Sequence, residues 1–138
     1  MEKILNYING ELVAPTSGNY LDNYNPSNGE VYSLIPDSEK QDIDNAVAAA
    51  KEAFKSWSKT PKQKRSDILM KLADTIEKYS EELIKAESKD NGKPESLAAH
   101  VDIPRAPANI RFFAGAILHD SSQMHEMDGM AINYTLRH

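Results

Sequence analysis

The strongest constraint on the fold of this chain is a long stretch of helical periodicity, which runs through residues 37–120. Apolar residues there recur every three or four positions, so each helix has one apolar face. The first face consists of Ile43, Ala46, Val47, Ala50, Phe54 and Trp57. The second follows Pro61, a residue suited to the first helical position, and consists of Ile68, Leu69, Leu72, Ala73, Ile76 and Tyr79. The sequence therefore predicts two amphipathic helices that pack against other protein.

Turn and cap residues set the limits of these helices. Ser38 and Gln41 form a capping-box pattern at the first start. A third, shorter helix is predicted from about residue 80 to residue 90. It should end there because Gly92 can adopt the left-handed conformation of a helix cap and Pro94 cannot continue a helix.

A fourth helix is predicted over residues 95–119, and its expected inward side chains are Leu97, Val101, Ile110, Phe113, Ala114 and Ile117. Pro104 and Pro107 interrupt this pattern. Each lacks a backbone donor and clashes with the preceding turn of a helix. We therefore expect a kink or a break near Asp102.

Both ends of the chain have β-type patterns. Residues 1–36 predict two hairpins, one turning at Asn9-Gly10 and the other between Pro26 and Gly29. Near the other end, residues 121–129 are predicted as a loop and residues 131–137 as a strand. A strand needs a neighbour for its backbone groups. We expect this one to pair with further chain or another subunit, in preference to an N-terminal hairpin.

Composition limits the classes of function. Hydrophobic residues make up 40% of the 138 residues, below the roughly 45–50% of an average globular domain, so core material is scarce. The net charge of −5 disfavours nucleic acid and anionic membranes as partners. No apolar run reaches the ~18 residues of a transmembrane helix, and no signal-peptide pattern opens the chain, so a cytoplasmic location is expected. The absence of cysteine excludes a cysteine nucleophile within these residues.

No motif in the chain forms a complete site for chemistry. The six glycines are too dispersed for a phosphate-binding loop, and no serine lies in a Gly-x-Ser-x-Gly elbow. His119, Asp120 and His125 are close in sequence, but their spacing matches no metal-ligand template, and a solvated helix end is the preferred interpretation. Residue patterns alone therefore indicate an α+β piece without a self-contained site.

Seven short motifs, in order and with suitable gaps, resemble the N-terminal portion of the aldehyde dehydrogenase family. They are Tyr7-Ile8-Asn9-Gly10-Glu11, Asn25-Pro26-Ser27-Asn28-Gly29-Glu30-Val31, residues 46–57, residues 65–76, Asp90-Asn91-Gly92-Lys93-Pro94, Phe112-Phe113-Ala114-Gly115 and Tyr134-Thr135-Leu136-Arg137. Within the family, residues 101–106 and 109–114 are similar to the branch that oxidises 2-hydroxymuconic or 2-aminomuconic semialdehyde. Those substrates carry a carboxylate as well as an aldehyde.

The resemblance implies a fold in which this chain is an α+β fragment of an α/β enzyme. Residues 1–36 would form the N-terminal β-hairpins. Residues 37–120 would supply four helices that flank a Rossmann-like cofactor domain, and residues 121–138 a loop and a strand of the oligomerisation arm. The catalytic domain would be absent, and the full-length enzyme would be a homo-oligomer, dimer or tetramer.

The resemblance also implies a reaction, the NAD- or NADP-dependent oxidation of a small aldehyde to an acid. The family's catalytic cysteine and glutamate, its oxyanion-hole asparagine and its cofactor groove are expected outside this sequence. The chain alone is therefore expected to be inactive and to bind no cofactor. The alternative is a non-catalytic interaction or oligomerisation module that binds a full-length relative.

Two sites within the chain follow from the resemblance. Arg105 corresponds to a position that lines the substrate tunnel, where a guanidinium can bind a carboxylate with two hydrogen bonds. The alternative is an exposed helix arginine. A monovalent cation site would use the Asp90 carboxylate and the main-chain carbonyls of Asn23 and Tyr24, since such ions prefer oxygen ligands. The alternative for Asp90 is a solvent-facing residue near a helix end.

Overall fold

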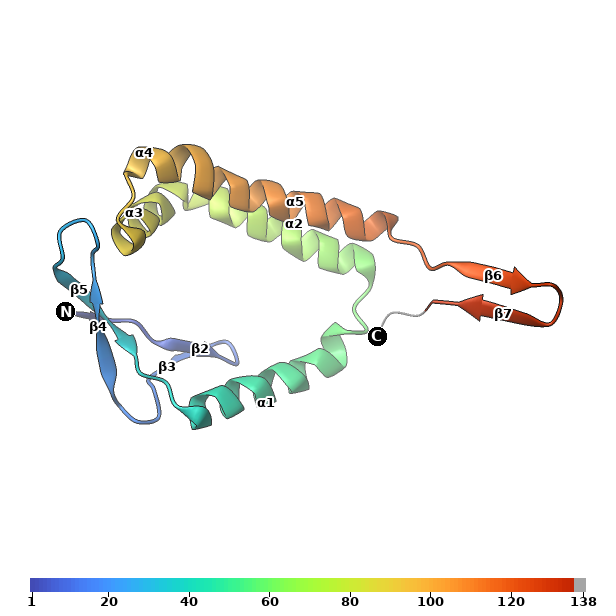
Figure 1. The fold of residues 1–138 in the computed structure, drawn as a ribbon, viewed down its shortest axis with the longest axis horizontal. Coiled ribbons are helices and arrows are strands. Elements are labelled where there is room, and N and C mark those ends of the chain that lie inside the picture. Colours follow the sequence, from blue (N-terminus) through green and yellow to red (C-terminus); the bar gives the residue numbers. More distant parts are fainter. Residues whose placement is uncertain (136–138) are drawn as a thin grey trace.

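The protein forms an open ring from which one β-hairpin projects (Figure 1). A computed structural model describes residues 1–135. The helical elements are α1 (Lys40–Trp57), α2 (Lys62–Lys78), α3 (Ser80–Asn91), α4 (Glu95–Leu97), a π-helical segment (Ala98–Asp102) and α5 (Ile103–His119). The strands are β1 (Glu2–Lys3), β2 (Asn6–Ile8), β3 (Glu11–Val13), β4 (Tyr20–Tyr24), β5 (Val31–Pro36), β6 (Met124–Met127) and β7 (Ala131–Tyr134).

Both predicted N-terminal hairpins are present. Strands β2 and β3 pair antiparallel around Asn9 and Gly10, whose φ angles of 55° and 84° are those of a turn that needs two left-handed residues. Strands β4 and β5 also pair antiparallel, and β1 adds to β5 in the parallel direction. Strand β1 was not predicted, because two residues are too few to show a periodic pattern.

The predicted start of α1 is wrong by one residue. The Ser38 hydroxyl is hydrogen-bonded to the side chain of Asn6 instead of capping the helix. Asp42 takes the capping role, because its carboxylate accepts the Glu39 amide at 2.9 Å and also both the amide and the hydroxyl of Thr16. The hydroxyl of Thr16, with these amides, holds the pKa of the Asp42 carboxyl below its ordinary value.

Helices α2 and α5 lie side by side, and their contact forms most of the small core (Figure 1). Within the described residues, the fully buried apolar side chains are three alanines, Ala73, Ala98 and Ala114. The buried Ser66 hydroxyl of α2 donates to the Ala114 carbonyl of α5 at 2.8 Å. Small residues at the contact let the two helices approach closely.

The expected distortion near Asp102 is present, but the chain does not break there. Residues 98–102 widen into a π-helical segment that continues directly into α5. Pro104 in the first turn of α5 and Pro107 further along it both lie within this continuous helical run, and each lacks a backbone donor. A π turn of this kind absorbs an irregularity in the helical hydrogen-bond ladder without ending the helix.

The predicted loop over residues 121–129 is wrong, and the last strand has a partner within the chain; pairing of its other edge with further protein stays a prediction. Strand β6 lies inside that stretch and pairs antiparallel with β7. The turn between them contains Asp128 and Gly129, both with positive φ. Asp-Gly is a strong hairpin signal that the sequence analysis overlooked. Strand β7 ends at Tyr134, and positions 136 and 137 of the predicted strand lie outside the described residues.

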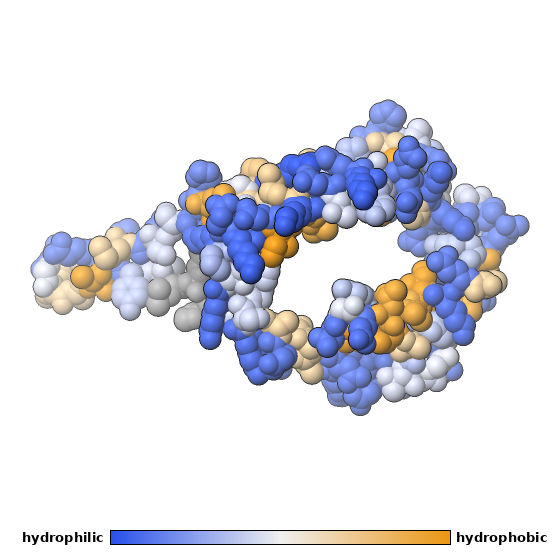
Figure 2. Space-filling view, turned by 180° about the vertical axis from the view of Figure 1, so that it is seen from behind, coloured by the Kyte–Doolittle hydropathy of each residue, from blue (hydrophilic) through white to orange (hydrophobic). Residues whose placement is uncertain are grey.

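Large apolar side chains line the opening of the ring without cover. Figure 2 shows hydrophobic surface along its inner wall, over the helices and the hairpins. Phe54 and Ile43 on α1 are 56% and 59% exposed. Three side chains that were predicted to point inward are exposed in this chain. Phe113 on α5 is 63% exposed, and Leu97 and Val101 are 47% and 46% exposed. Extended apolar surface of this kind is typical of an interaction surface.

Replacement of Gly92 by alanine tests the contact between the end of α3 and the β4–β5 turn. Gly92 has a φ of 77°, and a Cβ atom there would lie 3.0 Å from the Cβ of Pro26. Gly92→Ala should therefore lower the free energy of unfolding by about 1–3 kcal/mol, measured by urea denaturation. Gly29→Ala is the matched control, because φ is 74° and nothing lies within 4 Å. An equal cost for both variants would contradict the close contact.

Candidate functional site

The sequence-predicted cation ligands converge at the junction of the N-terminal sheet with α3. Asn23 lies on β4 and Asp90 near the end of α3, so residues far apart in sequence come together. The Asn23 amide nitrogen lies 3.4 Å from Asp90 Oδ1. Tyr24 is exposed, and its hydroxyl donates to Asp22 at 3.4 Å. The side chains of Asn23 and Asp90 therefore meet, whereas that of Tyr24 is directed elsewhere.

Two residues that the sequence analysis missed complete this cluster. The Tyr32 hydroxyl donates to Asp90 Oδ1 at 2.7 Å, and the Asn23 amide reaches Tyr32 Oη at 2.9 Å and Ser33 Oγ at 3.1 Å. Ser33 is opposite Asn23 in the β4–β5 ladder. Their only signal in the sequence is the hairpin itself, since pairing across it aligns residue 33 with residue 23.

Two charged side chains, Asp90 and Lys89, surround the phenol of Tyr32 in this cluster. The hydrogen bond to the Asp90 carboxylate raises the pKa of the Tyr32 phenol above its ordinary value. Lys89 Nζ lies 4.5 Å from the centre of the Tyr32 ring, a cation–π arrangement. The phenol therefore stays protonated and donates to Asp90 over the physiological pH range.

A cation in this cluster would have to be bound by the main-chain carbonyl oxygens of Asn23 and Tyr24 on β4, in addition to Asp90. The β4–β5 register shifts between Asn23 and Tyr24, and such a bulge removes a residue from regular ladder pairing. In the described part of the chain, no group of three or more histidine, cysteine, aspartate or glutamate residues could hold a metal ion. A monovalent cation held by Asp90 and the carbonyls of Asn23 and Tyr24 stays a prediction.

Arg105 lies on the exposed side of the first turns of α5. Among residues 1–135 its guanidinium has no hydrogen bond or ion pair. Arg111, six residues further along α5, is instead bound to Glu77 and Asp74 of α2 at 2.5 and 2.8 Å. Those carboxylates raise the pKa of Arg111. The hydrogen bonds of Arg111 therefore link α5 to α2. Arg105 is thus the arginine of α5 whose donors remain available to a ligand.

An ion-pair network lies just before α5. Lys93 Nζ donates to Glu87 of α3 at 2.9 Å and to Asp102, the last residue of the π-helical segment, at 2.5 Å. The Asp102 carboxylate, followed by that of Glu87, raises the pKa of Lys93. The network ties the end of α3 to the start of α5.

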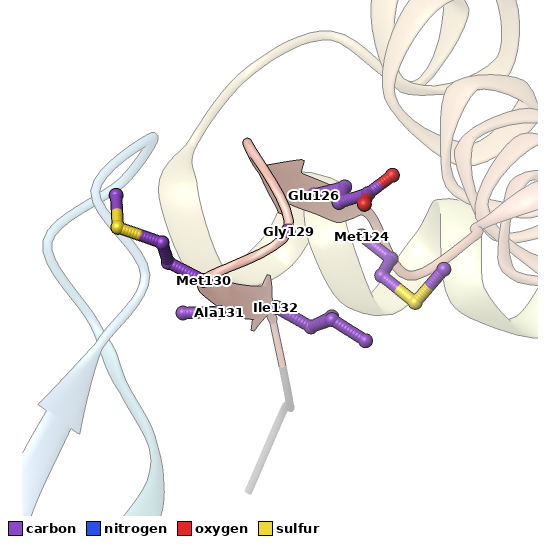
Figure 3. Close-up of a pocket in the computed structure, with 6 residues that line it drawn as sticks. All are labelled: Met124, Glu126, Gly129, Met130, Ala131 and Ile132. Atoms are coloured by element: carbon purple, nitrogen blue, oxygen red, sulfur yellow. The ribbon is translucent and has the colours of Figure 1, made fainter.

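One face of the projecting hairpin is apolar apart from Glu126. In Figure 3, the side chains of Met124, Glu126 and Ile132 extend toward the same side of the β6–β7 ribbon, around a shallow pocket. Alternation along the paired strands adds Tyr134 to this face. Met124, Ile132 and Tyr134 are 69%, 60% and 66% exposed. A two-stranded ribbon with such a face has unpaired edges and uncovered apolar surface.

The glycines of the described residues do not form a phosphate-binding loop. Five glycines lie at isolated positions with positive φ in turns and caps, and Gly115 lies inside α5. A dinucleotide-binding loop needs clustered glycines at a helix start. None of the described helices is long and apolar enough to cross a membrane.

Comparison with known proteins identifies the family. The profile of the aldehyde dehydrogenase family matches residues 12–138. The chain belongs to the aldehyde dehydrogenase family. It is 49% identical over 133 residues to the 2-aminomuconic semialdehyde dehydrogenase of Bos taurus, covering 96% of this chain and 27% of that protein. It is 39% identical to the 2-hydroxymuconic semialdehyde dehydrogenase of Pseudomonas sp. strain CF600, covering 99% and 29%. The resemblance noted from the motifs, including that to this branch, is confirmed.

Solved aldehyde dehydrogenase structures share the fold of this chain. PnpE in complex with nicotinamide adenine dinucleotide has a TM-score of 0.90 and 37% identity, over 97% of this chain and 27% of PnpE. The aldehyde dehydrogenase of Bacillus cereus in its NAD⁺ complex has a TM-score of 0.91 and 36% identity, over 96% and 28%. The chain thus spans about a quarter of the length of these family members. NAD use is a property of such full-length relatives.

Proposed function

We propose that this chain is the N-terminal part of an NAD(P)-dependent aldehyde dehydrogenase that oxidises a carboxylated semialdehyde to the acid. The observation that carries the proposal is family membership over residues 12–138 together with 49% identity to a 2-aminomuconic semialdehyde dehydrogenase. With no cysteine in its sequence, the chain cannot supply the family's nucleophile. Its own contribution is binding, orientation and assembly.

The uncovered inner wall of the ring supports a structural role within a larger enzyme. Exposed aromatic and aliphatic side chains on α1 and α5 need a covering surface. In the proposal, residues 37–120 flank a Rossmann-like cofactor domain formed by further chain. Residues 121–138 serve as the oligomerisation arm, because β6–β7 combines free edges with the apolar face of Met124, Ile132 and Tyr134.

Arg105 is the proposed substrate-binding residue. A guanidinium can bind the carboxylate of a semialdehyde through two parallel hydrogen bonds. The exposure of Arg105 on α5 and its lack of a partner within residues 1–135 leave it available for that contact.

Measurement of NADH formation tests the proposed function. The full-length protein, mixed with a carboxylated semialdehyde and NAD⁺, should produce NADH. The 138-residue chain under the same conditions should produce none. Turnover by the isolated chain would refute the assignment of the reactive groups to other parts of the protein. A full-length protein without turnover on any aldehyde would refute the reaction itself.

A non-catalytic interaction module is the second candidate, because the same exposed apolar surface can bind a separate protein. Such a module would bind a full-length relative through the same β6–β7 face and ring wall. Mixing the chain with a complete relative and measuring mass by light scattering distinguishes the two. A stable complex of defined stoichiometry would favour the module, and unchanged masses would count against it.

A further inference from the structure

The backbone and side chain of Lys93 are both fixed between α3 and the π-helical segment. Its amide donates to Asn91 Oδ1 at 3.0 Å, and its carbonyl accepts the Ser88 hydroxyl at 2.6 Å. Its ammonium group joins Glu87 at 2.9 Å and Asp102 at 2.5 Å, and the Lys93 side chain is only 23% exposed. Lys93 is therefore a rigid point from which Asp102 is held.

Asp102 is the residue at which the π-helical segment becomes α5. A π turn has less regular backbone hydrogen bonds than an α-helix, so its end is not fixed by the backbone alone. Arg105 follows Asp102 by three positions, and residues at that spacing lie on the same side of a helix. The direction in which Arg105 leaves α5 thus depends on the position of Asp102.

The remainder of α5 is fixed by different contacts. Arg111 binds Asp74 and Glu77, and the Ala114 carbonyl accepts from Ser66, all on α2. These contacts lie further along α5 and hold its middle. Within the described residues, Lys93 is the side chain whose ion pair holds Asp102, the residue just before the first turn of α5.

We propose that Lys93 is a positioning residue for Arg105. Its ion pair with Asp102 fixes the first turn of α5 and so aims the Arg105 guanidinium at the carboxylate of the substrate. The inference rests on the proposed function, because it takes Arg105 as the substrate-binding residue. An ion pair that is partly open to solvent contributes little to overall stability, so a positioning role predicts an effect on substrate discrimination instead.

Steady-state kinetics of Lys93→Met in the full-length protein test the proposal. The variant keeps the length of the side chain and removes its charge. For a carboxylated semialdehyde, KM should rise about 10-fold, as expected when a binding group is misplaced, with kcat nearly unchanged. For an uncharged aldehyde of similar length, KM should stay the same. Lys93→Arg should keep most of the discrimination, that is, the preference for the carboxylated over the uncharged aldehyde, since it keeps a cation within reach of Asp102.

Two further variants keep the test decisive. Lys85→Met is the matched control, because Lys85 lies exposed on the same helix, α3, without an ion pair, and it should leave both KM values unchanged. If Lys93→Met fails to fold, Asp102→Asn removes the other charge of the pair with almost no change of shape, and the same KM split is expected. Equal changes for both aldehydes, or none, would overturn the positioning role.

Arg105→Ala, measured in parallel, separates this inference from the proposed function. If Lys93 acts through Arg105, adding Lys93→Met to Arg105→Ala should raise KM less than about 2-fold further, since coupled residues are non-additive. Discrimination lost in Arg105→Ala but kept in Lys93→Met would overturn the role of Lys93 alone. Discrimination kept in Arg105→Ala would overturn both.

Discussion

In the full-length protein, Arg105→Ala should lower kcat/KM for a carboxylated semialdehyde by about 10- to 100-fold, which corresponds to the loss of a charge-assisted hydrogen-bonded pair. The loss should appear chiefly in KM, because the carboxylate is remote from the reacting aldehyde and is bound equally in the ground and transition states. For an uncharged aldehyde of similar length, kcat/KM should change little. Initial rates of NADH formation over a range of both aldehydes provide the measurement.

Two controls sharpen the Arg105 experiment. Asn109→Ala alters an exposed side chain one turn further along α5, and it should leave both aldehydes unaffected. Arg105→Lys keeps the charge but loses the planar fork, so it should recover only part of the binding. Equal losses for charged and uncharged aldehydes in Arg105→Ala would remove the proposed contact with the substrate carboxylate.

Ala114→Leu should separate α2 from α5 and lower the free energy of unfolding of the chain by about 1–3 kcal/mol. Ala114 is fully buried at the contact, and its carbonyl accepts the Ser66 hydroxyl. A leucine there must push the helices apart, which also strains that hydrogen bond and the ion pairs of Arg111 with Asp74 and Glu77. Urea denaturation followed by far-ultraviolet circular dichroism measures the change.

Ala116→Leu is the matched control for the α2–α5 contact. It introduces the same side chain on the same helix, two residues later, at an exposed position. Leucine is as good a helix former as most residues, so the free energy of unfolding should change by only a few tenths of a kcal/mol. If Ala114→Leu were as mild as Ala116→Leu, the close approach of α2 and α5 would be contradicted.

The hairpins and helices of this chain were predictable because their signals are local. The Asn9-Gly10 turn, the left-handed cap at Gly92 and the period of apolar residues each depend on a few neighbouring positions. Strand β7 was predicted, but its partner β6 was missed although the Asp128-Gly129 turn between them is an equally local signal. Residues 124–127 read Met-His-Glu-Met, in which apolar and polar residues do not alternate, so no strand pattern marked β6.

The predictions that failed at α1 and α5 depended on competition between distant residues. Ser38 had the right chemistry to cap α1, but Asn6 engages it, and Thr16 orients Asp42 for the role. Phe113 was predicted to point inward, but it is 63% exposed among the described residues. The helical period of α5 marks an apolar face but does not show whether another element of the chain covers it.

The candidate sites divide in the same way. The motifs pointed to Asn23, Asp90 and Arg105, because a resemblance to a family assigns roles to individual positions of the sequence. They gave no sign of Tyr32 and Ser33 beside Asp90, nor of the link from Lys93 to Asp102. Those contacts join residues on separate elements, and side-chain pairing of that kind is created by packing.

The sequence by itself determined the family, the order of hairpins and helices, and the position of the distortion before α5. Each of these depends on the spacing of neighbouring residues or on short motifs in a fixed order. Only the tertiary structure decided which polar groups meet around Asp90, which arginine of α5 is committed to α2, and which apolar faces stay uncovered. These depend on distances between elements that backbone propensity does not specify, since packing selects among many helix placements of similar local energy.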